Sequence, residues 1–214
     1  MKPSDTLLWL ASLANAQNYN NFKTKPSDLI NTQCRDSDKL PTLTYGSKDI
    51  VFTICTEKYI KGTVLEVHNA IVDFASYPKW NTFVIDVEAR SGSSLTPSPP
   101  PVGTKMTFTT TGLIPKVNTK SLEEISYVNP DVDAHSATRG TYAMSAWKGD
   151  MTKLAPLEHV NVVMNVGYGY TRYVSYESYY PGVTAAAIAL KGKLQKQFDQ
   201  QGEDLKKYVE GGSK

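Results

Sequence analysis

The segment from Ile60 to Val84, IKGTVLEVHNAIVDFASYPKWNTFV, constrains the fold more than any other part of this chain. Apolar residues recur at helical spacing through its first half, and Pro78 ends that helix. An aromatic-rich turn follows and leads directly into a strand pattern. Much later, from Val183 to Val209, the chain predicts one uninterrupted helix.

Strand patterns fill the interval between these helices, and one comes before the first of them. Apolar and polar residues alternate there at the spacing of half-buried strands. The predicted strands are 49–58, 83–89, 105–111, 117–128, 137–147, 159–166 and 170–178. Because these strands are short and joined by tight turns, an antiparallel sheet is favoured.

This order of elements is typical of an α+β helix-grip domain. In such a domain, a curved antiparallel sheet of about six or seven strands wraps around the long C-terminal helix. Two short helices follow the first strand, and the sheet and the final helix enclose a ligand cavity. The serine- and proline-rich loop at 91–102 is predicted to be mobile and is a candidate lid over that cavity.

A spaced series of residues in the first segment resembles the START-like superfamily, also called SRPBCC: Val67, Asp73, Phe74, Tyr77, Trp80 and Asn81. That superfamily includes polyketide cyclases and coenzyme Q-binding proteins. Three later segments are also similar to it, EISYVNP (124–130), TRYVSYESYYPG (171–182) and LKKYVE (205–210). The resemblance covers about residues 48–210 and implies the helix-grip fold. It implies no single reaction, because the family shares no catalytic signature.

We divide the chain into an N-terminal extension, residues 1–47, and a ligand-cavity domain, residues 48–214. The extension is expected to lie on the domain or to support a homodimer. Residues 1–16 fit either a signal peptide or a retained helix, and Pro3 and Asp5 favour the helix. We therefore expect a cytoplasmic protein, or a secreted one if 1–16 is cleaved.

Composition argues against several classes of protein. A net charge of +2 over 214 residues gives no electrostatic basis for binding nucleic acid. No apolar run is long enough to span a membrane. Cys34 and Cys55 lack the spacing of a zinc site and do not by themselves indicate a disulfide. No phosphate loop, nucleophile elbow or HExxH motif occurs, so neither a cofactor nor a metal is expected.

Four residues are candidates for proton transfer or charge stabilisation: His68, Tyr142, Tyr176 and Arg139. His68 lies on an apolar helix face, where a general acid or base and a core histidine with one hydrogen bond both fit. Arg139, if it points inward, would bind an enolate or phenolate oxygen, and if outward it is a surface cation. His159 falls on the polar side of its strand and is expected to face solvent.

We assume that the apolar face of each strand points into the cavity. The predicted ligand-binding residues are then Trp80, Phe83, Met106, Phe108, Val162, Met164 and Val174. One hypothesis is cofactor-free cyclisation, dehydration or isomerisation of a polyketide- or terpenoid-like molecule. The alternative is a non-catalytic carrier for a lipid or quinone, and a structural protein with a filled cavity is a weaker third. A titratable cluster inside the cavity favours the enzyme, and an all-apolar lining favours the carrier.

Overall fold

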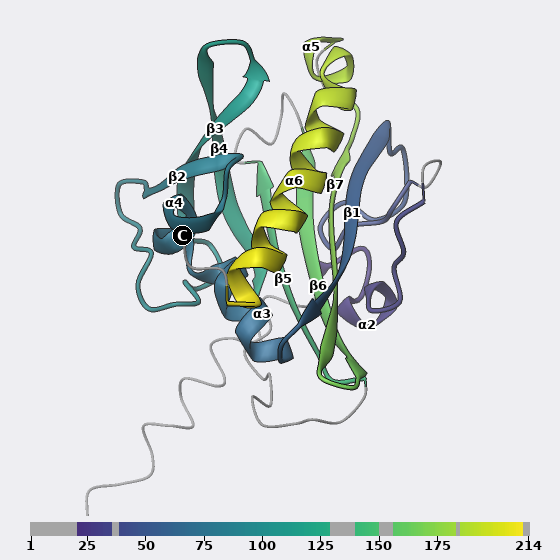
Figure 1. Cartoon of the computed structure of the whole chain (residues 1–214). Coiled ribbons are helices and arrows are strands. Elements are labelled where there is room, and N and C mark those ends of the chain that lie inside the picture. The colour runs from purple at the N-terminus through teal and green to yellow at the C-terminus, as the bar shows by residue number, and fades with distance from the viewer. Residues whose placement is uncertain (1–20, 36–38, 129–139, 150–155, 183–184, 212–214) are drawn as a thin grey trace, which may run out of the picture.

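A computed structural model of the chain describes residues 21–35, 39–128, 140–149, 156–182 and 185–211, and the structural statements below concern these residues. They form a seven-stranded antiparallel sheet with the strand order β1-β7-β6-β5-β4-β3-β2 (Figure 1). The strands are β1 (Phe52–Lys61), β2 (Val84–Ala89), β3 (Lys105–Ile114), β4 (Val117–Val128), β5 (Tyr142–Gly149), β6 (Leu157–Gly167) and β7 (Tyr170–Tyr179). The predicted antiparallel sheet is confirmed.

The two short helices predicted after the first strand are present. α3 (Val64–Val72) begins at a capping box, in which the Thr63 hydroxyl accepts from the backbone N–H of Glu66. The carboxylate of Glu66 accepts in turn from the backbone N–H of Thr63, at 2.7 Å. α4 (Tyr77–Trp80) follows a single turn of 3-10 helix and leads into β2.

The C-terminal helix differs from the prediction, because it is interrupted. A break at Leu190 separates α5 (Ala185–Ala189) from α6 (Lys191–Val209). Gly192 lies just after the break and lowers helix propensity there. Figure 1 shows α6, in yellow, running across one face of the sheet. Gly202 lets it approach β1 closely, since a Cβ there would lie 3.0 Å from Oγ1 of Thr56.

From the end of β4 to β7, both faces of the sheet are buried, each in its own apolar core. The inner face, toward α6, packs Phe108, Trp147 and Tyr173 against α3, α4 and α6. The outer face is covered by the N-terminal strap, which we define as residues 21–35 and 39–49 and which contains α2 (Pro26–Leu29). The outer core consists of Leu29, Leu40 and Leu43 of the strap with Tyr127, Met144, Ala146, Val160, Val162, Val174 and Tyr176 of the sheet.

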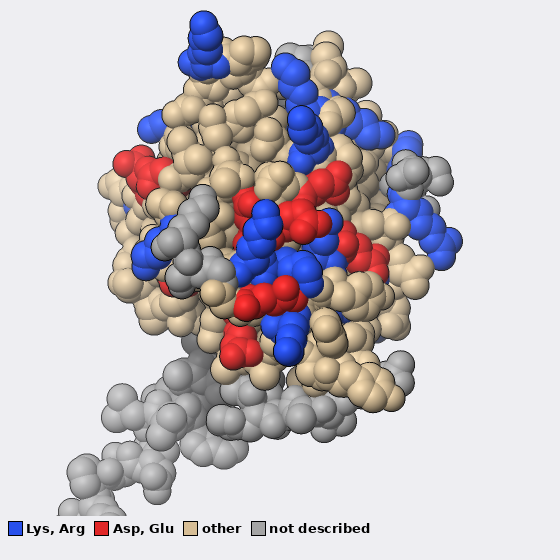
Figure 2. Space-filling view, viewed as in Figure 1, with Lys and Arg blue, Asp and Glu red and all other residues tan. Residues whose placement is uncertain are grey.

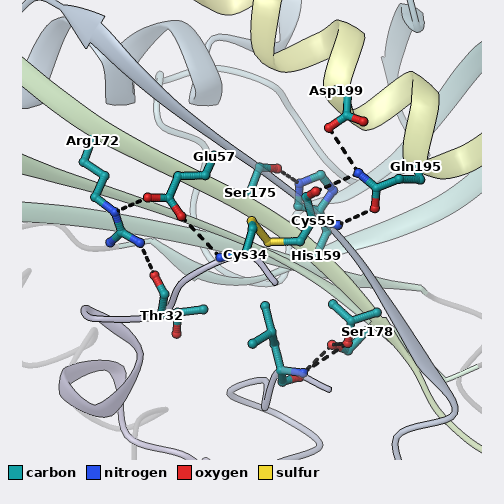
Figure 3. Close-up of a disulfide and its surroundings, with 12 residues drawn as sticks. Thr32, Cys34, Cys55, Glu57, His159, Arg172, Ser175, Ser178, Gln195 and Asp199 are labelled. Atoms are coloured by element: carbon teal, nitrogen blue, oxygen red, sulfur yellow. Dashed lines mark hydrogen bonds and ion pairs between the residues drawn. A yellow bond between two sulfur atoms is a disulfide. The ribbon is translucent and has the colours of Figure 1, made fainter. Parts of the chain in front are cut away.

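A disulfide and an ion pair hold the strap near β1 (Figure 3). Cys34 and Cys55 are disulfide-bonded, with their Cα atoms 5.6 Å apart. The Nε atom of Arg172 donates to Oε1 of Glu57 at 2.7 Å, and its guanidinium also donates to the backbone carbonyl of Thr32. Glu57 accepts a further hydrogen bond from the N–H of Cys34, at 3.2 Å. The cysteine spacing alone did not indicate this disulfide.

A buried carboxylate anchors the strap at a second point. Glu158 is fully buried on β6, and its carboxylate accepts from both the backbone N–H and the hydroxyl of Thr44, each at 2.7 Å. The hydroxyl of Ser126 donates to the same carboxylate at 2.6 Å. Three donors therefore replace the water that the charged group would lose on burial.

The predicted orientation of β6 and β7 is wrong. Val162, Val174 and Tyr176 belong to the outer core, whereas the polar face that carries His159 points inward. The strap explains the error, because its leucines make the outer face as apolar as a core and so remove the need for apolar residues to turn inward.

The loop at 91–102 contributes no residue to the cavity described below. Leu95 and Val102 are partly buried against the inner core, and the hydroxyl of Ser98 donates to the carbonyl of Val72 at 3.4 Å. The role of candidate lid is therefore not supported. None of the described helices combines the length and the apolar character needed to cross a membrane.

Loss of the disulfide is expected to destabilise the protein by about 3 kcal/mol, because the cross-link closes a loop of 21 residues in the unfolded chain. Urea denaturation of the wild type with and without reductant measures this difference. The double variant Cys34→Ser/Cys55→Ser is the control, since reductant has no disulfide to break in it. Equal stability of the oxidised wild type and the double variant would contradict the role given to the disulfide.

Candidate functional site

A cavity of about 330 Å³ lies between the inner face of the sheet and the α5–α6 segment. Aromatic side chains supply much of its wall: Phe83, Phe108, Trp147, Tyr179 and Phe198. Leu113 and Leu190 border it where the β3–β4 hairpin meets the break between α5 and α6. A wall of this kind suits an apolar ligand that carries a few polar groups.

Strand register places three of the residues that line the cavity in one row across β5, β6 and β7. Trp147 of β5 pairs with His159 of β6, and His159 pairs with Glu177 of β7. All three side chains line the cavity. Each lies on the inner face because β5, β6 and β7 alternate in phase with one another.

Short contacts surround the His159 ring. Its Nε2 atom is hydrogen-bonded to the hydroxyl of Ser175 at 2.8 Å, and its Nδ1 atom lies 3.7 Å from Oε2 of Glu177. The ring lies between Trp147 and Phe198, with ring centroids 4.5 and 4.9 Å away. These contacts fix the imidazole in one orientation at the cavity wall.

Burial perturbs both titratable groups of this pair. It raises the pKa of Glu177 to about 7, although a hydrogen bond with the Tyr179 side chain opposes the shift. It lowers the pKa of His159 to about 3, against the opposing effect of a hydrogen bond with Asn161. His159 is therefore neutral near pH 7, and Glu177 populates both its protonated and its ionised form.

A second polar layer lies behind His159 on the same face. The hydroxyl of Tyr173 donates to Oδ1 of Asn161 at 2.9 Å, and Asn161 pairs with Ser175 in the sheet register. Asn161, Tyr173 and Ser175 are each about 1% exposed. This layer supports the imidazole from the side away from the cavity. Two carboxyl groups line the cavity, Glu177 and Glu123, and the side chain of Glu177, next to His159, is 12% exposed.

Two predicted ligand-binding residues, Phe83 and Phe108, line the cavity. Met106 lies in the inner core next to Glu123 in the register but outside the cavity lining. Trp80 does not line the cavity and stacks on Tyr208, with ring centroids 6.0 Å apart.

The other predicted strand residues point away from the cavity. Val162, Val174 and Tyr176 belong to the outer core, and Met164 and Tyr142 pair with each other in the same alternation. The hydroxyl of Tyr176 donates to the backbone carbonyl of Pro41 in the strap, at 2.7 Å. Arg139 lies outside the described residues.

His68 is buried on α3, and it does not line the cavity. Burial lowers its pKa to about 4, and a hydrogen bond with the backbone of Met144 opposes this shift. This is the geometry of a core histidine, one of the two alternatives for this residue. Sequence reasoning missed His159 and gave Glu177 no role of its own. The alternation of Ser175 and Glu177 with Val174 and Tyr176 was the available signal.

Solved structures with the same architecture are known. TTHA0849 from Thermus thermophilus matches with a TM-score of 0.54 and 13% identity, over 76% of this chain and 99% of its own. The chain has the helix-grip fold.

Two further helix-grip structures have contrasting descriptions. The Zhui aromatase/cyclase from Streptomyces sp. R1128 matches with a TM-score of 0.56 and 8% identity, over 74% of this chain and 93% of its own. Human StAR-related lipid transfer protein 5 matches with a TM-score of 0.55 and 12% identity, over 95% and 93%. No family model matches the sequence, and no curated protein matches it.

The raised pKa of Glu177 makes the stability of this helix-grip domain depend on pH. Between its ordinary pKa of 4.5 and its folded value of about 7, the folded state binds more protons than the unfolded state. The contribution of Glu177 to stability is thus full below pH 4.5, falls as pH rises toward 7, and levels off above. Glu177→Gln removes this dependence.

As pH rises from 4.5 to about 7, the free energy of unfolding of Glu177→Gln should increase relative to that of the wild type by about 3 kcal/mol. Comparing the two proteins by urea denaturation at each pH cancels His159, whose lowered pKa acts in the opposite direction. Glu88→Gln, at an exposed carboxylate on β2, is the matched control. A constant difference between Glu177→Gln and the wild type at every pH would show that Glu177 titrates normally.

Proposed function

We propose that this protein binds a hydrophobic, oxygenated small molecule in the cavity and transfers a proton within it, with Glu177 as the acid and base. Cyclisation, dehydration and isomerisation of a polyketide- or terpenoid-like molecule are reactions of this type, and none needs a cofactor. The observation that carries the proposal is the placement of Glu177, beside His159 and Tyr179, on the wall of a largely aromatic cavity.

The chemistry assigned to Glu177 balances within the ligand. The ionised carboxylate removes a proton from a carbon next to a carbonyl, and the electron pair moves onto the carbonyl oxygen. The protonated carboxyl then returns the proton to another carbon, which completes an isomerisation, or to a departing hydroxyl, which completes a dehydration. The phenol of Tyr179 and the imidazole of His159 keep the carboxyl at a fixed position while its charge changes.

The non-catalytic carrier is the second candidate, because the same cavity is apolar enough to hold a lipid or quinone. Helix-grip proteins described as an aromatase/cyclase and as a lipid transfer protein show that the fold is compatible with both activities. The choice therefore depends on the polar groups. A carrier gains nothing from a buried carboxyl and a buried imidazole, since burying these polar groups costs stability.

A generic proton-abstraction substrate tests the proposal without knowledge of the natural ligand. Nitrobenzisoxazole is a small aromatic ring that opens when a base removes its single acidic proton, and the product is coloured. The wild type should accelerate this opening over buffer, with a rate that rises as pH increases through about 7. Glu177→Gln should lower the rate by about 100-fold, because it removes the base.

Glu88→Gln is the control and should retain the full rate, since this carboxylate is exposed on β2. Quenching of Trp147 fluorescence by the same compound reports binding separately from reaction. Quenching with no acceleration by the wild type would contradict the catalytic assignment and favour the carrier.

A further inference from the structure

The tip of the β3–β4 hairpin and α5 lie at the same end of the molecule (Figure 1), and both segments contribute residues to the cavity wall. Leu113 of the hairpin, Ala187 of α5 and Leu190 at the break before α6 line the cavity there. The ammonium group of Lys193 donates to the backbone carbonyl of Leu113 at 3.0 Å and so ties the hairpin to the start of α6. The hairpin tip and the α5–α6 segment thus form one rim beside the cavity.

Apolar side chains project from this rim into solvent. Ile114 and Val117 of the hairpin are 42% and 50% exposed, and Ile188 of α5 is 47% exposed. They directly adjoin the residues that line the cavity, so apolar surface continues from the interior to the outside. We call Ile114, Val117 and Ile188, with the lysines described next, the portal face.

The charge of the portal face has one sign. Lys116, Lys191 and Lys193 are exposed there, and neither the hairpin tip, 112–120, nor residues 185–198 contain an aspartate or glutamate. In Figure 2, the charged side chains at the upper end are all lysine or arginine. Acidic side chains lie over the middle and the lower part of this view. Lys191 and Lys193 also occupy the first turn of α6, where the helix dipole disfavours cations.

Exposed aliphatic side chains surrounded by lysines are the chemistry of a surface that binds an anionic bilayer. We propose that the portal face docks on an anionic phospholipid membrane, with the three aliphatic side chains in the interfacial region and the lysines against the headgroups. The cavity then opens toward the bilayer, so that an apolar ligand exchanges between the two without crossing water. This inference does not depend on catalysis.

A second copy of this chain fits the portal face less well. A symmetric contact would bring the lysines of one copy against those of the other. Three half-exposed aliphatic residues also supply much less apolar surface than a stable protein interface buries. An anionic bilayer avoids the repulsion between lysines, because its headgroups carry the opposite charge. Its apolar interior accepts the three aliphatic side chains.

Vesicle co-sedimentation tests the proposal on the full chain. The protein should sediment with vesicles of phosphatidylcholine mixed with phosphatidylglycerol, and added salt should weaken that binding. Ile188→Ser should weaken binding by about tenfold, since it removes a membrane-facing side chain. Lys116→Asn should weaken it about fivefold, and asparagine tolerates the positive φ of 62° at this position.

Two matched controls lie at the opposite end of the molecule. Tyr168→Asn removes a fully exposed aromatic ring from the β6–β7 turn, and Lys207→Gln removes an exposed charge from the far end of α6. Both should bind vesicles as the wild type does. Absence of binding to the mixed vesicles, or equal losses in the controls, would overturn the proposal. So would a concentration-dependent dimer, seen by sedimentation without vesicles, that Ile188→Ser abolishes.

Discussion

Coverage of the outer sheet face by the N-terminal strap is the interaction on which the rest of this structure depends. The leucines of the strap bury Val160, Val162 and Val174 from a side that would otherwise be wet. Burial of such side chains contributes about 1.5–3 kcal/mol each. Because the outer core supplies this stabilisation, the inner face can carry polar groups at positions that an ordinary one-sided sheet would reserve for apolar residues.

Those polar groups acquire their chemical character from the same burial. His159 and Glu177 lie side by side in a low-dielectric wall, where each charged form is disfavoured. The aromatic rings of Trp147 and Phe198 exclude water from the imidazole, and Ser175 fixes its orientation. A carboxyl that titrates near neutral pH is the result, at a place that a ligand in the cavity can reach.

The sequence predicted the helix-grip order and the antiparallel sheet, because alternation and helix breaks are local signals. It did not predict which face of each strand is the inner one. On β3 the apolar residues do point inward, as assumed. Met106 and Phe108 are buried, whereas Thr107 and Thr109 on the outer side are only partly buried. On β6 the assumption fails, because the strap covers Val160 and Val162 as completely as α6 covers the inner face. Alternation separates two faces, and only long-range packing decides which one meets the ligand.

The central claim is that the carboxyl of Glu177 faces inward and that burial raises its pKa to about 7. Carbon-13 NMR of side-chain carboxyl groups, assigned by comparison with Glu177→Gln, measures its titration directly. The account predicts a midpoint near the folded value of about 7. A midpoint at the ordinary value of 4.5 would contradict it, because the carboxyl would then be solvated on the outside of the sheet or paired with a charged His159.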